Sequence, residues 1–391
     1  MKNQIDANSV LIYLCMFCFS LLFIFISSQY MYKKDGTMSR GRNRIIAYLF
    51  IGFGIIIPCI FAAFRGLNVG TDIGTYIIHN FNYASNSDLT FLQFRDYVHL
   101  QIPEPLFALL MYICCKIGNI HLLFFLIEVF VIVPLAYSLI KVGSRKTLTI
   151  EFALFYFLFY NFSLSGMRQS IAMSFLTVAL TFLMEKKYRT TIFFIIIAQL
   201  FHMSVGLIVL ISVACYFVNR SRYKKILCTI IVLCLLIAFF GFGSYAYKVA
   251  SLVAIFNPRY GYFIETYFHS GINFSEIPST DIVIKTALVS IPLWQANKKR
   301  TLTKENQLMT MFILIGRYFV LFNGVFYESM RIAYYFDWLI VMYVPKTLHL
   351  IKHSINRMVY KSVYVSLAFL YWIYFIMYIG GYGTNLVTFN I

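Results

Sequence analysis

Long apolar runs recur along the whole 391-residue chain, and they decide what it can fold into. Segments such as 10–28 and 121–140 stay apolar for close to the ~20 residues that a helix needs to cross a bilayer. Of all residues, 60% are apolar and only 12% are charged, whereas soluble domains carry roughly a quarter charged residues. A soluble globular fold is therefore excluded. A β-barrel is excluded as well, because barrel strands alternate polar and apolar residues over ~10-residue segments.

The apolar runs predict an all-α integral membrane protein, a polytopic bundle with about 11–13 transmembrane or re-entrant helices. The predicted helices cover 10–31, 45–64, 105–117, 121–141, 150–164, 168–184, 190–201, 204–218, 226–242, 281–297, 308–324, 331–348 and 359–379. Runs of ten to fourteen residues are more typical of re-entrant or half-helices than of full crossings. We expect residues 1–391 to form one membrane domain.

The basic residues indicate which helix ends share a side of the membrane. Lys and Arg number 33 against 15 Asp and Glu, a formal charge of +18. They form short clusters between apolar runs, which is the positive-inside pattern of cytoplasmic loops and not the basic stripe of a nucleic-acid-binding protein. No nucleic acid partner is expected. The clusters predicted to be cytoplasmic are 33–44, 141–146, 185–189, 220–225, 298–304 and 346–361.

This sidedness predicts two long periplasmic loops, 65–104 and 243–280, both rich in aromatic residues. Their rings are either anchors at the headgroup level or stacking surfaces for sugars. An odd number of crossings must separate Glu104 from Lys141, yet two apolar runs lie between them. Either 105–117 dips into the membrane and returns, which we favour, or the 141–146 cluster breaks the positive-inside rule.

Polar residues gather near the predicted outer ends of the helices. They are Arg65, Asp72, Tyr76, Glu104, Arg168, Gln169, His202, Arg331 and Tyr335. Arg317 lies inside the apolar run 308–324, which precedes Arg331 and Tyr335. Ordinary explanations exist for several, since Arg65 and Arg331 could snorkel to the interface and Asp72 could cap a helix. Arg168 and Arg317 are harder to explain that way. An arginine at the centre of a membrane helix costs ~2.5–3.5 kcal/mol on insertion scales and usually faces a cavity or a partner.

These residue types together favour chemistry on a diphosphate. Several guanidinium groups suit a diphosphate, because each can bind two phosphate oxygens at once. Carboxylates beside a histidine suit acid–base catalysis. No D-x-D or H-x-x-x-H spacing, P-loop or dinucleotide fingerprint occurs, and the eight cysteines lie inside apolar runs without partner ligands. We expect no metal and no cofactor.

Five pieces of the chain carry a family resemblance. They are FRGLNVGTDIGTY (64–76), the acidic Glu104, SGMRQSIAMSFLTVAL (165–180), AQLFHMSVGLIVL (198–210) and MRIAYYF (330–336). Because these pieces occur in this order, the sequence resembles the EpsG-like branch of Wzy-type O-antigen and exopolysaccharide polymerases.

The resemblance implies a metal-independent, GT-C-like glycosyltransferase of the bacterial inner membrane, with its active site facing the periplasm. Such enzymes join oligosaccharide repeat units carried on undecaprenyl diphosphate into O-antigen or a similar surface polysaccharide. The expected partners are the lipid-linked donor and acceptor, membrane lipids and a chain-length regulator protein.

Roles follow residue by residue from the matched pieces. Arg65, Arg168 and Arg331 are expected to bind the diphosphate. The base is either His202 or Glu104, and Asp72 is a further catalytic candidate. Gln169, Tyr76 and Tyr335 are expected to bind substrate. Arg317 lies outside the matched pieces, and its place inside an apolar run makes it a further candidate for substrate binding.

Two other classes remain alternatives. A flippase or transporter for lipid-linked oligosaccharides would handle the same substrate, but it should line a central cavity with charges and contain two similar halves. A membrane O-acyltransferase would need its histidine on the cytoplasmic side, whereas the loop charges place His202 outside.

Overall fold

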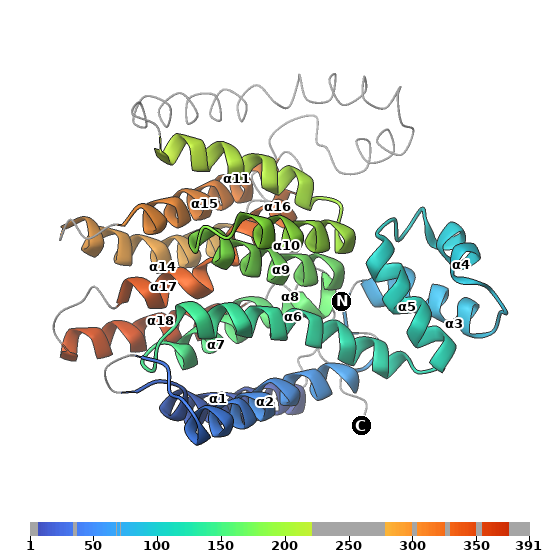
Figure 1. Ribbon diagram of the computed structural model, residues 1–391, viewed down its shortest axis with the longest axis horizontal. Coiled ribbons are helices and arrows are strands. Elements are labelled where there is room, and N and C mark those ends of the chain that lie inside the picture. The colour runs from blue at the N-terminus through green and yellow to red at the C-terminus, as the bar shows by residue number, and fades with distance from the viewer. Residues whose placement is uncertain are drawn as a thin grey trace. The chain divides into compact units, whose positions relative to one another are not determined.

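The computed structural model describes residues 7–33, 37–67, 69–70, 72–220, 278–298, 303–324, 329–348 and 354–374. The chain divides into two compact units, described separately below. Unit 1 comprises Met1–Gly206 and Ile351–Ile391, and unit 2 comprises Leu207–Leu350. The described residues are helical throughout apart from turns and one isolated bridge between Tyr32 and Met38 (Figure 1).

Unit 1 contains most of the predicted membrane helices. Its elements are α1 (Ala7–Met31), α2 (Arg42–Ala63), η1 (Ile73–Ile77), α3 (Ile78–Ser85), α4 (Phe91–Val98), α5 (Pro105–Ile117), α6 (Ile120–Val142), α7 (Leu148–Phe155), η2 (Tyr156–Tyr160), α8 (Asn161–Ser165), α9 (Met167–Met184), α10 (Tyr188–Phe201) and α18 (Ser354–Tyr374). The turn at the end of α10 leads into α11 (Val205–Arg220).

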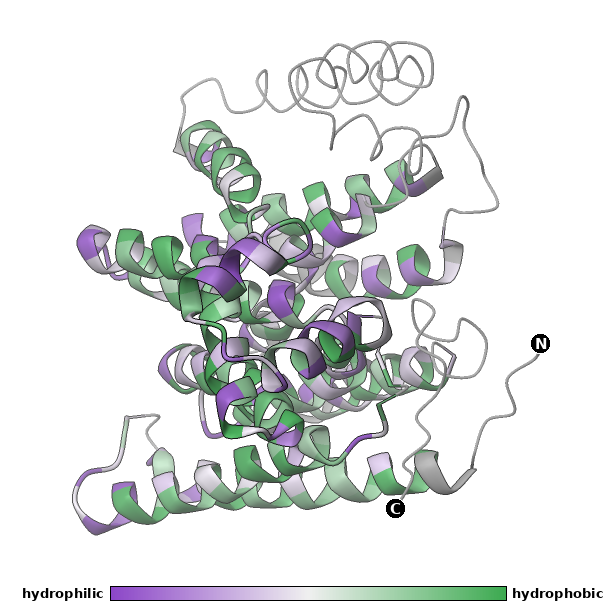
Figure 2. Cartoon of the chain, turned by 90° about the vertical axis from the view of Figure 1, so that its right-hand side faces the viewer, coloured by the Kyte–Doolittle hydropathy of each residue, from purple (hydrophilic) through white to green (hydrophobic). Residues whose placement is uncertain are grey.

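Five helical segments within the described residues are long and apolar enough to cross a membrane. They are Val10–Met31, Arg42–Ala63, Ile120–Val142, Leu148–Ser165 and Met167–Met184, with shorter apolar helices at Pro105–Ile117, Tyr188–Phe201 and Val205–Asn219. In Figure 2, α1 and α2 are hydrophobic along nearly all their length, and hydrophilic residues gather at their connection. The prediction of an all-α membrane protein is confirmed, while the helix expected at 226–242 lies outside the described residues.

Helices α1 and α2 pack as an antiparallel pair, and small residues such as Gly54 and Ser20 let their backbones approach closely. A side-chain carbon added at Gly54 would lie 2.8 Å from Cγ1 of Ile24. Ser20 uses the same close approach to donate a hydrogen bond of 2.6 Å to the Gly54 carbonyl, and its Oγ also lies 2.5 Å from the Tyr156 hydroxyl. These bonds satisfy polar groups that no water would reach inside a bilayer.

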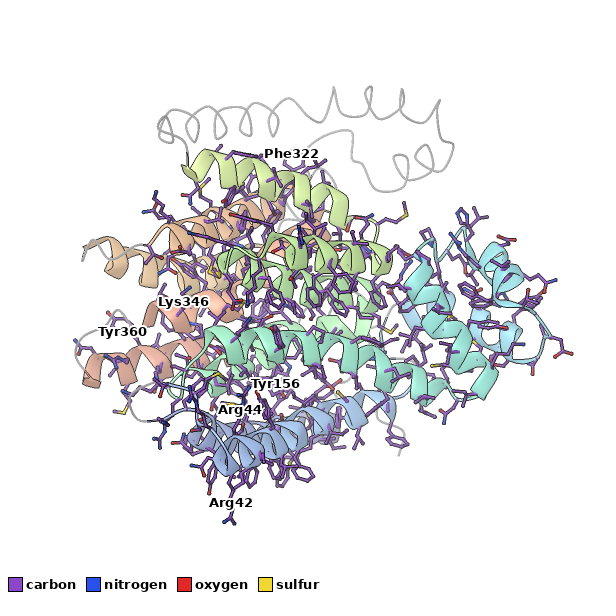
Figure 3. All side chains as sticks on the ribbon, viewed as in Figure 1. Arg42, Arg44, Tyr156, Phe322, Lys346 and Tyr360 are labelled. Carbon is purple, nitrogen blue, oxygen red and sulfur yellow. The ribbon has the colours of Figure 1, made fainter. Side chains whose placement is uncertain are left out.

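One end of unit 1 collects its basic segments, and this end is called the basic end below. Lys141 and Lys187 both pair with Glu185, at 2.7 and 2.9 Å, which joins the end of α6 to the turn between α9 and α10. Lys361 donates to the carbonyl of Lys146. At the start of α2, Arg42 and Arg44 are exposed (Figure 3). Basic clusters predicted to share the cytoplasmic side thus lie together in unit 1.

Residues 65–104, expected as a loop, contain three helical segments, η1, α3 and α4. Thr90 and Gln93 form a capping box that starts α4, a local signal that fixes a helix even in a polar segment. Phe94 packs on Tyr112 of α5, while Tyr83 stacks on Tyr97 at 4.1 Å with both rings partly exposed. These helices gather with α5 beside one end of α6 (Figure 1).

Helix α5 has the predicted bounds, and its length bears on the crossing count. Its 13 residues span roughly 20 Å, which is short of the ~30 Å hydrocarbon core. It ends at Gly118, whose φ of 73° favours glycine, and the chain turns at once into α6. Packing of α5 against α3 and α4 agrees with a segment that does not cross.

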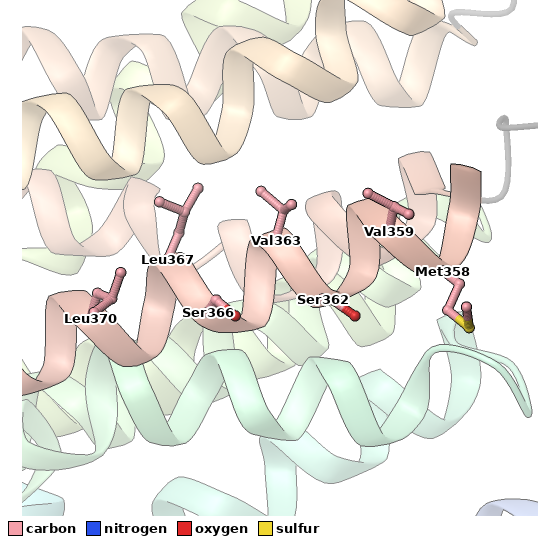
Figure 4. Close-up of a pocket in the computed structure, with 7 residues that line it drawn as sticks. All are labelled: Met358, Val359, Ser362, Val363, Ser366, Leu367 and Leu370. Atoms are coloured by element: carbon pink, nitrogen blue, oxygen red, sulfur yellow. The ribbon is translucent and has the colours of Figure 1, made fainter. Parts of the chain in front are cut away.

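An exposed apolar face runs along α18. A shallow pocket of about 390 Å³ is lined by this helix alone, and Figure 4 shows Val359, Val363 and Leu367 projecting from it. The part of the chain that the structure describes does not show what covers this face.

Unit 2 contains α14 (Ser279–Lys298), α15 (Lys304–Leu321), η4 (Phe322–Gly324), α16 (Ser329–Asp337) and α17 (Ile340–Leu348), together with most of α11. The single helix predicted at 331–348 is wrong, because the chain breaks at Trp338 and Leu339 between α16 and α17. The predicted outer loop 243–280 lies outside the described residues except for its last three.

A buried ion network holds the unit 2 helices together. Lys285 lies 2.6 Å from Asp281, and Arg317 lies 2.8 Å from the same carboxylate. Both cations also pair with Asp337. With two cations and two carboxylates the network is neutral, which is what makes its burial in an apolar unit tolerable.

Candidate active site

The N-terminus of α9 is the centre of the candidate site, and the motif around Gly70 packs against the end of α8, immediately before it. Gly70 has a φ of 110°, and a side-chain carbon added there would lie 2.5 Å from the carbonyl oxygen of Leu164. Only glycine allows this backbone contact. Two motifs that are about 95 residues apart in the sequence, 64–76 and 165–180, therefore meet through their backbones.

Arg168, in the first turn of α9, is held by groups from two other segments. Its Nη1 donates to Oε2 of Glu104 at 2.6 Å and to the carbonyl of Gln101 at 3.1 Å. Its Nε donates to the Tyr76 hydroxyl at 3.1 Å, and its Cζ lies 4.7 Å from the centroid of the Tyr76 ring. Among the described residues, no acceptor lies on Nη2. Two N–H donors of this arginine thus remain for a ligand.

The position of Arg168 is unfavourable for the helix itself. A helix N-terminus carries a partial positive charge, which disfavours a cation in its first turn. Glu104 offsets this effect from the residue before α5, where its side chain makes no capping bond. Arg168 therefore does not stabilise its own helix, and other segments hold it in place. This combination points to a functional role for Arg168.

Tyr76 and Asp72 extend the same network. Tyr76 donates a hydrogen bond of 2.6 Å to Oδ2 of Asp72, so Asp72 does not cap a helix as the simpler explanation required. Burial raises the pKa of the Tyr76 hydroxyl well above its ordinary value, with Asp72 acting in the same direction and Arg168 opposing it. The hydroxyl therefore stays protonated and links the arginine to the carboxylate.

The turn at His202 reaches the same place. Two helices, α10 and α11, are separated by extended backbone at His202, as the sequence predicted for a broken helix. The amide of Met203 donates to Oε1 of Glu104 at 3.3 Å, and Nδ1 of His202 lies 2.7 Å from the Ser204 hydroxyl. Glu104 thus joins α5, α9 and the His202 turn, with both of its oxygens engaged.

Arg65 lies beneath this network, inside the protein. It is only 2% exposed; its Cζ lies 4.6 Å from the Phe124 ring centroid, and its Nη2 lies 3.3 Å from Sδ of Met167. Burial lowers the pKa of Arg65, and Glu128 of α6 is the first of the charges that oppose this effect. The snorkelling explanation for Arg65 is wrong, because the guanidinium points into the core.

Sequence reasoning missed Glu128. This buried carboxylate accepts a hydrogen bond of 2.9 Å from Ser163, and among the described residues its Oε2 has no hydrogen-bond partner. The available signal was an acidic residue in the middle of a 23-residue apolar helix.

The remaining predicted residues divide between the units. Gln169 is buried in α9 of unit 1. Arg331 is exposed and Tyr335 is buried on α16 of unit 2, and Arg317 belongs to the ion network there. Unit 1 therefore brings together Asp72, Tyr76, Glu104, Arg168 and the His202 turn. Because carboxylates occupy the Arg317 guanidinium, we leave Arg317 out of the site developed below.

The fold and this site define a polytopic membrane protein with a polar, arginine-centred cluster at one end of its helices. Comparison with known families gives a more specific identity. The EpsG family model matches residues 48–387, so the chain belongs to the EpsG family, a family of Wzy-like polymerases. The expected family is confirmed. The chain matches no curated protein and no solved structure.

Proposed function

We propose that this protein joins oligosaccharide repeat units carried on undecaprenyl diphosphate into O-antigen or a similar surface polysaccharide. Membership of a family of Wzy-like polymerases supports this proposal. The observation that carries it furthest is the Arg168 cluster. It offers unused guanidinium donors beside carboxylates and a histidine turn, which suits a reaction whose leaving group is a diphosphate.

The proposed reaction is a direct displacement at the anomeric carbon of the growing chain. A hydroxyl of the incoming repeat unit attacks this carbon, the bond between the carbon and the diphosphate oxygen breaks, and the hydroxyl proton passes to a base. The Nη2 donors of Arg168 stabilise the negative charge that develops on the departing diphosphate. Since the guanidinium of Arg168 meets this charge, the reaction proposed here needs no metal.

We assign the base to His202 in preference to Glu104. Both Glu104 oxygens are engaged, one by Arg168 and one by the Met203 amide, which suits a positioning role. In His202, Nδ1 faces the Ser204 hydroxyl. A hydrogen bond from a protonated Nδ1 to the Ser204 hydroxyl favours the neutral tautomer in which Nε2 carries no proton, and this is the form of the imidazole that acts as a base.

The site is proposed to face the periplasm of the inner membrane. Helix α9 begins at the site and ends beside the basic end of unit 1, where Glu185 pairs with Lys141 and Lys187. Its 18 residues span roughly 27 Å, close to the ~30 Å hydrocarbon thickness. If the basic end is cytoplasmic, the site lies at the opposite surface.

The test is incubation of the purified full-length protein with lipid-linked repeat units in the presence of a chelator, followed by gel separation of the glycans. We expect a ladder of regularly spaced products. If the purified, folded protein moves the units across a liposome membrane without lengthening them, the protein is a flippase and the proposed polymerase function is wrong.

A further inference from the structure

A pocket lined partly by cationic residues lies at the basic end of unit 1, away from the Arg168 site. It has a volume of about 570 Å³. Its walls come from the last turns of α1, the connection between α6 and α7, the start of α7, and α18. The lining residues are Phe25, Gln29, Arg145, Lys146, Thr149, Ile150 and Lys361.

The charge of this pocket is unbalanced. Three of its lining residues, Arg145, Lys146 and Lys361, are cationic, and none of the lining residues is acidic. Glu151 follows Ile150 in the sequence, but its carboxylate faces Gly143, where an added side-chain carbon would lie 2.6 Å from Oε2. Three like charges around one cavity repel each other unless an anion lies between them.

Two of the cations are held in place by neutral partners. Nε of Arg145 donates a 2.6 Å hydrogen bond to the Gln29 side chain, and Nζ of Lys361 donates to the Lys146 carbonyl at 2.5 Å. These bonds fix the cations without neutralising them. Within the described part of the chain, the terminal nitrogens of Arg145 and the Nζ of Lys146 have no acceptor, so several charged donors remain for a ligand.

The remaining wall is apolar. Ile150 lines the cavity, and Phe25 lies on the outer face of α1 with 51% of its surface exposed. A pocket lined by cations, with an exposed apolar residue of α1 at its edge, matches a ligand with a phosphate group and an acyl chain. Basic pockets between membrane helices at the cytoplasmic surface bind lipid headgroups in this way.

From these observations we propose that the pocket binds the phosphate of an anionic phospholipid, with Arg145, Lys146 and Lys361 around the headgroup and Phe25 against the acyl chain. This site is separate from the binding of the lipid-linked substrate. It does not depend on the proposed polymerase reaction.

Native mass spectrometry of the detergent-purified full-length protein, titrated with phosphatidylglycerol or phosphatidylcholine, tests the assignment. The pocket variant is the double substitution Arg145→Gln with Lys361→Gln. The matched control is Arg42→Gln with Arg44→Gln, which also removes two positive charges from the basic end but lies outside the pocket. We expect the wild type and the control to bind phosphatidylglycerol more tightly than phosphatidylcholine. The pocket variant should lose about tenfold in affinity for phosphatidylglycerol, the cost of roughly one charge-assisted hydrogen bond.

Equal losses of phosphatidylglycerol affinity in the two double variants would mean that general surface charge causes the binding, and the proposal would be wrong. Unchanged binding in the pocket variant would overturn it as well. Inorganic phosphate distinguishes the ligand source, because displacement of phosphatidylglycerol at equal concentration would make the ligand a free anion. Should the pocket variant not fold, photoactivatable phosphatidylglycerol on the wild type decides the matter. Its crosslinks must map to α1, α7 or α18 around the pocket, and crosslinks elsewhere only would contradict the proposal.

Discussion

Arg168 and Glu104 lie 64 positions apart in the sequence and form an ion pair of 2.6 Å that joins the first turn of α9 to the residue before α5. Glu104 also accepts the amide of Met203, and Arg168 also binds the Tyr76 hydroxyl. One pair thus connects the four matched pieces that meet in unit 1, around Tyr76, Glu104, Arg168 and Met203.

Replacing Arg168 with lysine tests the need for a guanidinium. Arg168→Lys keeps the charge but loses the planar fork that contacts Glu104, Gln101 and Tyr76 at once. We expect a folded, inserted protein whose product is a single repeat unit, with polymerisation lowered by at least ~100-fold. A glycan ladder of normal length at normal expression would remove Arg168 from the diphosphate role.

Exchanging the charges of Glu104 and Arg168 distinguishes a structural role of this ion pair from a catalytic one. Glu104→Arg alone should lower the abundance of the protein, because two cations then face each other at the start of α9. Adding Arg168→Glu restores opposite charges, so abundance should recover, while polymerisation stays absent because the guanidinium has moved. Recovery of both by the double variant, measured by membrane abundance and glycan gel, would show that the pair is structural only.

Tyr76→Phe removes a hydroxyl while keeping the ring that lies against Arg168. We expect about a tenfold loss of turnover, the scale of one or two hydrogen bonds to charged groups. Since burial keeps the pKa of Tyr76 well above its ordinary value, the hydroxyl does not ionise in the working range. The alkaline limbs of the wild-type and variant pH profiles should therefore coincide. An alkaline limb that disappears in Tyr76→Phe would mean that Tyr76 itself titrates.

The unit 2 network predicts a stability effect without a catalytic one. Lys285 is fully buried, and Lys285→Met leaves two carboxylates with one cation. Breaking a buried ion set in this way costs about 3–5 kcal/mol, so thermal unfolding in detergent should begin at a clearly lower temperature. The control is Lys116→Met, at an exposed lysine that donates to the Ser87 carbonyl. Equal unfolding temperatures for the two variants would contradict the network's role.

The sequence predicted the helices well wherever long apolar runs define them. The bounds of α5 agree with the prediction to the residue, and those of α6 and α9 agree within one. The break at His202 was also predictable, because a helix through it would exceed the membrane thickness. The helices of 65–104 were missed since they are short and polar, and only the cap at Thr90 marks one of them.

The contacts within the site were harder to predict from the sequence than the identity of its residues. Residue types and positions pointed to Arg168, Glu104 and His202, but the sequence could not show that Glu104 uses both oxygens to hold the other segments. Likewise, the pairing of Arg317 with Asp281 and Asp337 depends on three helices that meet only in the folded unit. For Arg65 the sequence left snorkelling and a diphosphate role both open, because its place beside a helix end looks the same whether the side chain turns in or out.

The most direct test of the central claim counts two products of the same reaction. Purified wild type, Arg168→Lys and His202→Gln are incubated with lipid-linked repeat units, and released undecaprenyl diphosphate and new glycosidic bonds are both quantified. We expect one released diphosphate for each bond in the wild type. We also expect a loss of ~100-fold or more in both variants, since glutamine at 202 can form hydrogen bonds but cannot accept the proton. Substantial activity in His202→Gln would return the base to Glu104, and wild-type protein that forms no bonds at all would contradict the polymerase.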